Sequence, residues 1–318
     1  MMIDDLNEII TTLKKYFIIA EGVGVEMHPN DVSDENLSKF KNSGVTMISI
    51  GIQSFNAQCI YSLGRKEVDH ARIFEAIKNA KFETVDMDLI FAIPGQTAEI
   101  LLKDIETAFE NGATQVSTYP FIDFTFANNR YKPLPEEDKK MLLTEISRFC
   151  KQNGYKRTSV WTFAKENTEK YSSITRDNFL GFGVSATTLL KNQFKLNTFS
   201  IEEYVKRTEQ GHLPTSLTLR FSYRQRMTYY LFWSAYSMRI SPKGFKKFFG
   251  KSLNKLFGPE LLICRMLGFL ERDGESYYLS ERGAYYYHYI EQAYTTAYID
   301  KMWNISRVTP FPDKIVLK

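Results

Sequence analysis

The first half of the chain alternates between segments with apolar residues at helical spacing and short strand-like segments. The helical spacing is found in residues 5–17, 34–42, 71–80 and 98–110. Residues 45–52 form a continuous apolar run of the kind seen in buried parallel strands, and residues 22–27, 84–91 and 115–119 are also predicted to be strands. A weaker pair follows, with a helix over 136–153 and a strand over 156–163. This order predicts an α/β fold in which crossover helices connect parallel strands.

The second half changes in character, and we predict a domain boundary after residue 195. Residues 201–318 are helix-rich and very aromatic, and residues 268–280 have the pattern of two strands joined by a turn at Asp273-Gly274. Helices followed by such a hairpin indicate a winged helix-turn-helix. The predicted organisation is therefore a (β/α) domain over 1–195 and a helical, winged-helix-like domain over 196–318.

Composition and charge favour an ordinary folded globular protein. Apolar residues make up 43% and charged residues 25% of the chain, as in ordinary globular proteins. No stretch reaches the ~18 apolar residues of a membrane span, and the acidic start is unlike a signal peptide. We expect a cytoplasmic protein with no membrane span. The net charge of +4 is small and the hairpin is acidic, so we expect no nucleic-acid partner.

Several predicted strands end on polar residues. Glu26 ends the first strand, Gln53 follows the second, and Asp88 lies in the third. Ligands of parallel α/β folds bind at the carboxyl ends of the strands, where a carboxylate or an amide can hydrogen-bond a ribose or an amino group. Each residue alone is about as well explained by capping a helix or holding a loop. Their combination predicts a nucleoside site.

The amino-acid sequences of these segments resemble those of a known family. The segments 48–55 (ISIGIQSF), 63–65 (LGR) and 88–97 (DLIFAIPGQT) match, in order and spacing, conserved blocks of the oxygen-independent coproporphyrinogen III oxidase family of radical S-adenosylmethionine (SAM) enzymes. Residues 26–29 (EMHP) and 181–186 (GFGVSA) resemble two further blocks. The resemblance covers roughly residues 5–195 and, more loosely, the C-terminal domain.

The resemblance implies a radical SAM-type (β/α) partial barrel and assigns roles to four residues. Carried over by position, Glu26 and Gln53 contact the ribose and methionine region of SAM, Arg65 its carboxylate, and Asp88 its ribose or adenine side. An arginine fits a carboxylate because the guanidinium can donate two parallel hydrogen bonds. A surface charge after a helix is the alternative for Arg65. The family also implies a [4Fe–4S] cluster, a tetrapyrrole-type substrate and an electron donor.

Two parts of the family pattern are missing from this sequence. The C-x₃-C-x₂-C loop that ligates the cluster is absent, as is a glycine-rich turn that holds the SAM amino group. Cys59, Cys150 and Cys264 are too far apart to replace a single cysteine loop, so we predict no metal ligand and leave the catalytic residues unassigned. The barrel should lack its first strands, which would expose an edge at the strand of Val25 or Ile48.

Two explanations of this pattern and three functions remain open. The chain is either a truncated reading frame or a degenerate relative that has lost radical chemistry. The first is favoured because Gln53, Arg65 and Asp88 still fit a SAM site. The functions are an oxidoreductase-family protein for a porphyrin-type substrate, inactive as this chain alone, a haem-binding chaperone, and a non-catalytic nucleotide- or protein-binding module. His28, at a strand end, is the best-placed candidate haem ligand, whereas His288 is expected in the core or on the surface.

Overall fold

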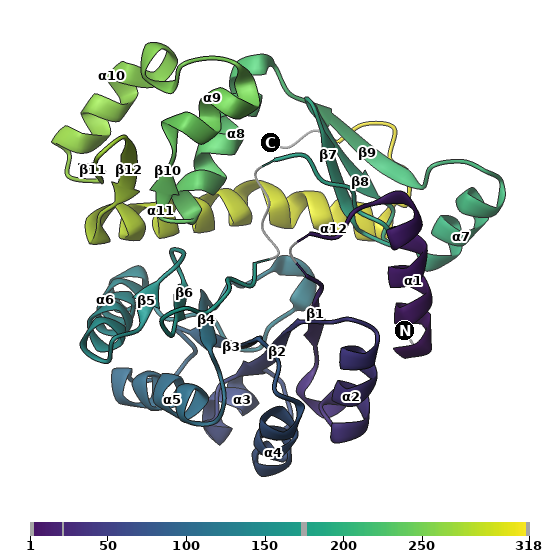
Figure 1. The fold of residues 1–318 in the computed structure, drawn as a ribbon, viewed down its shortest axis with the longest axis vertical. Coiled ribbons are helices and arrows are strands. Elements are labelled where there is room, and N and C mark those ends of the chain that lie inside the picture. Colours follow the sequence, from purple (N-terminus) through teal and green to yellow (C-terminus); the bar gives the residue numbers. More distant parts are fainter. Residues whose placement is uncertain (1–2, 21, 173–176, 316–318) are drawn as a thin grey trace. The chain divides into compact units, whose positions relative to one another are not determined.

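A computed structural model describes residues 3–20, 22–172 and 177–315 of the chain, which divides into two compact units. Unit 1 comprises Met1–Phe121 and Asn129–Ser172, and unit 2 comprises Ile122–Asn128 and Ser173–Lys318 (Figure 1). The division between the units after Ser172 falls earlier in the chain than the predicted boundary after residue 195. The reason is that the segment before this boundary contributes a strand to an antiparallel sheet of unit 2 instead of extending the parallel sheet. The functional domain boundary stays a prediction.

Unit 1 is built on a six-stranded sheet with the order β1-β2-β3-β4-β6-β5. Its first four strands are parallel, which confirms the predicted α/β class. The strands are β1 (Gly24–Met27), β2 (Met47–Gln53), β3 (Thr84–Phe91), β4 (Gln115–Pro120), β5 (Lys156–Arg157) and β6 (Thr162–Ala164). Among the described residues β1 is an edge strand, as expected.

The crossover helices of unit 1 follow the strands along the chain and begin at the polar residues that capping chemistry favours. Ser33 and Thr97 each accept a hydrogen bond from a backbone N–H of the first turn of the helix that follows. Figure 1 shows α2 to α6 along the outer side of the curved sheet. The helices are α1 (Ile3–Tyr16), α2 (Asp34–Asn42), α3 (Ala57–Ser62), α4 (His70–Ala80), α5 (Ala98–Glu110) and α6 (Glu136–Gln152), with a 3₁₀ turn at Pro29–Asp31.

One sheet face carries the core of unit 1. Ile48 and Ile50 of β2 and Met87 and Leu89 of β3 are fully buried. Because side chains alternate along a strand, the residues between them point to the opposite face. The helix side of the sheet is therefore apolar, and the other face is free to carry polar groups.

One prediction for unit 1 is wrong. The single strand predicted over 156–163 is two short antiparallel strands, β5 and β6. Thr158 donates its backbone N–H to the carbonyl of Thr162 at 2.8 Å, which closes a tight turn between them. Two short strands joined by a tight turn have the same mixture of apolar and polar residues as one continuous strand. The sequence pattern therefore could not distinguish a hairpin from a single strand.

Unit 2 contains an antiparallel sheet and a winged helix-turn-helix. The sheet has the order β7-β8-β9, and the winged helix runs α8, β10, α9, α10, β11, β12 with the strand order β10-β12-β11. The predicted hairpin is confirmed, because Asp273 pairs with Ser276 around the turn. The elements are β7 (Thr187–Leu190), β8 (Gln193–Asn197), α7 (Ile201–Glu209), β9 (Thr215–Arg220), α8 (Tyr223–Tyr236), β10 (Arg239–Ile240), α9 (Pro242–Phe249), α10 (Leu253–Met266), β11 (Leu270–Asp273), β12 (Ser276–Leu279), α11 (Glu281–Tyr294), a π-helical turn (Thr295–Ile299) and α12 (Asp300–Val308), with a 3₁₀ turn at Thr125–Ala127.

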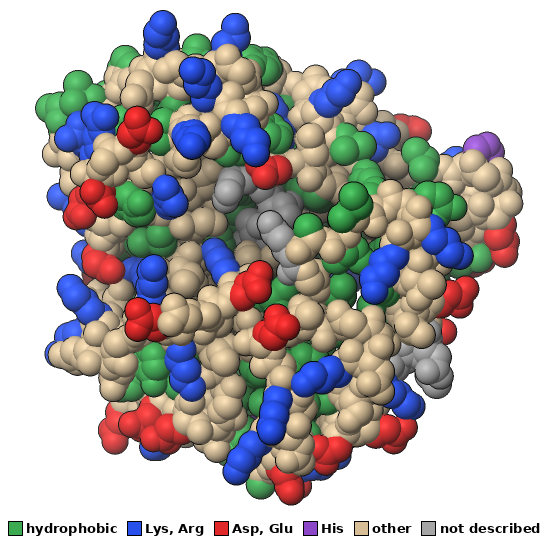
Figure 2. Space-filling view, in the orientation of Figure 1, with side chains coloured by type: hydrophobic (Ala, Val, Ile, Leu, Met, Phe, Trp, Pro, Cys, Tyr) green, Lys and Arg blue, Asp and Glu red, His purple; other side chains and the backbone are tan. Residues whose placement is uncertain are grey.

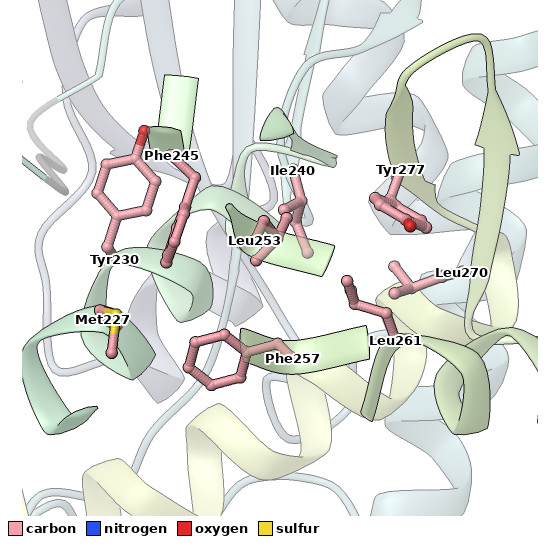
Figure 3. Close-up of a cluster of buried hydrophobic side chains, with 9 residues drawn as sticks. All are labelled: Met227, Tyr230, Ile240, Phe245, Leu253, Phe257, Leu261, Leu270 and Tyr277. Atoms are coloured by element: carbon pink, nitrogen blue, oxygen red, sulfur yellow. The ribbon is translucent and has the colours of Figure 1, made fainter. Parts of the chain in front are cut away.

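The winged helix has an aromatic core of its own, which Figure 3 shows in close-up. Phe245 of α9 is fully buried and lies against Tyr230, Phe249 and Phe257. The high aromatic content of the second half is therefore used for packing here, in line with the usual role of aromatic side chains. The cluster comprises Met227, Tyr230, Ile240, Phe245, Leu253, Phe257, Leu261, Leu270 and Tyr277.

The net positive charge of the chain comes from residues of the winged helix. Residues 222–280 contain ten lysines and arginines and four acidic residues, an excess larger than the net +4 of the whole chain. Figure 2 shows basic side chains gathered over the α8–α10 region. The basic balance therefore gives no support for an anionic ligand on the sheet of unit 1. No helix in the described part of the chain has the length and hydropathy needed to cross a membrane.

Candidate functional site

The face of the sheet opposite the helices is lined by polar side chains. Strand register brings them together, because directly paired residues of neighbouring strands point to the same face. Glu26 pairs with Ser49, which pairs with Asp86, and the row continues through the next strands. We call this set the polar face: Glu26, Ser49, Asp86, Asp88, Gln115, Ser117 and Thr162.

Two carboxyl groups of β3 form the centre of the polar face, and each is held by a serine of a neighbouring strand. Ser49 donates its hydroxyl to Asp88 Oδ2 at 2.9 Å, and Ser117 donates to Asp86 Oδ2 at 2.9 Å. The hydroxyl oxygens of Ser117 and Thr162 lie 3.2 Å apart and continue the network. Each carboxyl group is thus held by a serine hydroxyl of a neighbouring strand, and Asp86 has a further side-chain hydrogen bond with Gln115 of β4.

Burial raises the pKa of both carboxyl groups. Asp86 is almost completely buried, and its pKa is raised first by loss of solvation and then by the negative charge of Asp88. The pKa of Asp88 is raised by burial, an effect that its hydrogen bond from Ser49 partly offsets, and also by the charge of Glu26. The pair therefore binds protons at pH values where an ordinary aspartate has lost them.

We expect Asp86→Asn to stabilise the protein at neutral pH. Because the pKa of Asp86 is raised in the folded state, the folded protein holds a proton that the unfolded chain releases. The free energy of unfolding of the wild type should therefore fall, relative to that of Asp86→Asn, as the pH rises from about 5 to about 8. Urea unfolding of both proteins across this range measures the difference. The exposed Glu8→Gln is the control, and a difference that stays constant with pH would contradict the prediction.

The end of β2 carries the second half of the candidate site. Gln53 has a left-handed backbone conformation, with φ of 71°, and its side chain is buried. Arg65 reaches back from the turn after α3, and its guanidinium donates to the carbonyl of Gly51 at 3.4 Å. A Cβ added at Gly51 would lie 2.8 Å from Gln53 Nε2 and 4.0 Å from the guanidinium. Both side chains therefore meet at a residue that lacks a side chain.

The turn after β2 is fixed by a buried carboxylate. Asp104 of α5 accepts hydrogen bonds from the hydroxyl of Ser54 and from the backbone N–H of Phe55. Burial raises the pKa of Asp104 to about 6, although both hydrogen bonds oppose the shift. The direction in which the chain leaves Gln53 is thus set by the helix packed behind the sheet.

The four residues predicted for the site form two pairs along one strand. Glu26 and Asp88 flank Ser49 in the neighbouring strands, whereas Gln53 and Arg65 meet at Gly51. Two residues of a strand span about 7 Å. The pairs therefore lie side by side on β2 at a spacing that one small ligand can bridge.

Sequence reasoning missed the residues that support these four. Ser49, Gly51 and Asp86 lie inside the predicted strands, where polar or small residues recur at every second position. That alternation was the available signal. Tyr171, which donates its hydroxyl to Glu26 Oε1 at 3.2 Å, is 145 residues away in the chain and left no local signal.

Gly51→Ala tests whether the space over this glycine matters. The added methyl group would meet only the end of the flexible Gln53 side chain, so we expect little change in unfolding temperature but a several-fold loss of affinity for a ligand bound by Gln53. Calorimetry with SAM measures this. Gly258→Ala, at a position with no neighbouring atom within 4 Å, is the control, and an equal loss in both variants would contradict the prediction.

No histidine or cysteine belongs to the polar face as defined above. His28 is exposed, and its Nδ1 accepts the backbone N–H of Asn30 at 3.2 Å. His288 is fully buried, with its Nε2 2.8 Å from Gln292 Nε2, in agreement with a core position. Cys59 and Cys150 are buried in helices, and burial raises the pKa of the Cys150 thiol to about 12. In the described part of the chain no three His, Cys, Asp or Glu residues are grouped to hold a metal ion.

Comparisons with known proteins match the part of the chain that carries the site. The Radical SAM superfamily profile matches residues 2–108, the segment that contains Glu26, Gln53, Arg65 and Asp88. The heme chaperone HemW of Lactococcus lactis is 33% identical over 200 residues, which cover 59% of this chain and 53% of the relative. HemW of Bacillus subtilis is 26% identical over 273 residues, covering 81% of this chain and 72% of the relative.

The comparisons also include an oxidase. The oxygen-independent coproporphyrinogen III oxidase of Escherichia coli is 25% identical over 215 residues, which cover 60% of this chain and 47% of the enzyme. The solved structure of coproporphyrinogen III oxidase (HemN) from Escherichia coli, described as a radical SAM enzyme, superposes with a TM-score of 0.75 over 94% of this chain and 75% of that one, at 18% identity. This chain spans about half the length of the Lactococcus and Escherichia relatives that it matches in sequence. The parallel sheet, its polar strand ends and these similarities together place the chain in the HemN/HemW-like branch of the radical SAM superfamily.

Proposed function

We propose that the polar face, together with Gln53 and Arg65, binds SAM. The observation that carries the proposal is the meeting of Gln53 and Arg65 over Gly51, two residues along β2 from Ser49, which holds Asp88. A nucleoside linked to an amino acid needs acceptors for its hydroxyl groups and a cation for its carboxylate. This stretch of β2 is flanked by both.

Each of the four residues has a role that suits its chemistry. The carboxyl groups of Glu26 and Asp88 accept hydrogen bonds from ribose hydroxyl groups or from an amino group, and Gln53 can both donate and accept. Arg65 holds the carboxylate of the methionine part by two parallel hydrogen bonds. Arg65 is exposed, which leaves its guanidinium accessible to a ligand.

A [4Fe–4S] cluster does not fit the residues described for this face. Such clusters are held by cysteine thiolates, whereas Cys59 and Cys150 lie in helices and Cys264 lies in unit 2. We therefore propose that this chain by itself binds SAM without cleaving it. In the wider family the cluster supplies the electron that starts radical chemistry, and an electron donor belongs to that reaction.

The proposed substrate class is a tetrapyrrole. An oxidase-like role on a porphyrin follows from the Escherichia relative, and a haem chaperone is the second candidate because the Lactococcus and Bacillus relatives carry that name. His28 is poorly prepared as a haem ligand. Its Nδ1 accepts a backbone N–H, so the ring proton lies on Nε2, and coordination through Nε2 would require that hydrogen bond to break.

Titration calorimetry of the purified chain with SAM tests the proposal. We expect saturable binding, and no 5′-deoxyadenosine after iron–sulfur reconstitution and reduction. Absence of SAM binding would contradict the site, and robust cleavage would contradict the proposal about the cluster. For the second candidate, a haem titration that shifts the Soret band in the wild type and in His212→Ala, but not in His28→Ala, would support His28 as the ligand.

A further inference from the structure

The chain segment after β6 crosses the sheet at the amino-terminal ends of its strands. We call residues 165–171 the strap. Thr168 donates its hydroxyl to the carbonyl of Thr114 at 3.2 Å, just before β4. Thr84, the first residue of β3, donates its hydroxyl to the strap carbonyl of Glu169 at 2.7 Å. The strap therefore runs from β4 across β3 and ends near β1.

The end of the strap is fixed by a buried amide. Gln115 is fully buried, and its Nε2 donates to the backbone carbonyl of Tyr171 at 3.0 Å. Gln115 itself belongs to the polar face, next to Asp86 in the register of the sheet. The position of the Tyr171 backbone is thus tied to the same row of residues that carries the two aspartates.

The Tyr171 ring occupies a notch that only glycine leaves open. A Cβ added at Gly24 would lie 2.3 Å from Cε2 of the ring and 2.9 Å from Cδ2. These distances are far below van der Waals contact, so the ring packs on the backbone of β1. From this seat the phenol donates to Glu26 Oε1 at 3.2 Å. The seat and the hydrogen bond lie two residues apart on one strand.

The phenol can act only as a donor toward Glu26. Burial raises the pKa of Tyr171, and the charge of Glu26 raises it further, so the hydroxyl keeps its proton throughout the working range. Glu26 is exposed, and an exposed carboxylate without a fixed partner samples several rotamers. One hydrogen bond from a seated ring selects one of them and leaves the other carboxylate oxygen for a ligand.

We propose that Tyr171 is a positioning residue that holds Glu26 in the orientation in which it accepts a hydrogen bond from SAM. The inference rests on the proposed SAM site and deepens it. The strap makes the orientation of a β1 carboxylate depend on a segment 145 residues further along the chain. Tyr171 need not touch SAM itself.

A double-mutant cycle on the full chain tests this role. Tyr171→Phe removes only the hydroxyl, and we expect SAM affinity to fall about three- to tenfold, the range of one hydrogen bond's net contribution. In a Glu26→Ala background the same change should have no effect, because no carboxylate is left to position. Equal losses in both backgrounds would show a merely structural role, and an unchanged affinity of Tyr171→Phe would overturn the proposal.

Gly24→Ala provides a second test that touches neither polar group. The added methyl group should push the ring from its seat and reproduce the loss of affinity seen with Tyr171→Phe, whereas Gly258→Ala should not. Wild-type affinity in Gly24→Ala would contradict the role of the seat. Failure of the wild-type chain to bind SAM would instead overturn the proposed function, so the two failures are distinguishable.

Discussion

Arg65→Ala should lower the affinity for SAM by about ten- to a hundredfold. The Arg65 guanidinium donates to the carbonyl of Gly51 near the end of β2, and a hydrogen bond to a charged partner contributes about 1.5–3 kcal/mol. Arg65→Lys should recover only part of this loss, because an ammonium group cannot form the paired hydrogen bonds of a guanidinium. Titration calorimetry at fixed ionic strength measures all three proteins.

Arg72→Ala is the matched control for Arg65→Ala. Arg72 is exposed on α4, and its guanidinium donates to the carbonyl of Asn30 at 3.4 Å, so it has a comparable long carbonyl contact away from Gly51. We expect its SAM affinity to equal that of the wild type. A similar loss in both variants would mean that general electrostatic attraction, and not a specific contact at Gly51, accounts for the role of Arg65.

Phe245→Ala should have the largest effect on the stability of unit 2. The ring is fully buried and packs against three other aromatic rings, so its removal leaves a cavity as well as losing apolar burial. Substitutions of this kind cost about 3–5 kcal/mol. Urea unfolding followed by tryptophan fluorescence should show the winged-helix transition at a lower midpoint.

The control for this substitution is Phe182→Ala. Phe182 is 65% exposed in the same unit, and we expect its removal to change the free energy of unfolding by less than about 0.5 kcal/mol. Comparable effects in the two variants would contradict the packing described for the winged helix.

The elements that sequence predicted best are those with a strong local signal. The bounds of β3 (Thr84–Phe91) and α5 (Ala98–Glu110) agree with the prediction, because a strand with apolar residues at alternate positions precedes a capping threonine and an amphipathic helix. The hairpin of the winged helix was found through its Asp-Gly turn. In contrast, the sheet formed by β7, β8 and β9 was missed. Its strands are short and contain both apolar and polar residues, and the helix α7 lies between the paired strands β8 and β9 in the chain.

The site residues that could be predicted are likewise those with a signal in the local sequence, whereas contacts between distant segments could not be predicted. Glu26, Gln53 and Asp88 were found because they mark strand ends or interrupt apolar runs, and Arg65 through its motif. The structure shows how they approach one another through Ser49 and Gly51, which depends on strand register. Tyr171 was out of reach because its contact with Glu26 is created by a strap that crosses three strands.

The most direct test of the SAM site is hydrogen–deuterium exchange of the wild-type chain with and without SAM. The amides of the segment between Gln53 and Arg65, which contains α3, lie outside the parallel strand pairing of the sheet, so their exchange can respond to a ligand. The account predicts that saturating SAM slows exchange in peptides covering residues 51–66 and leaves the winged helix unchanged. No change in these peptides, or protection confined to unit 2, would contradict the central claim.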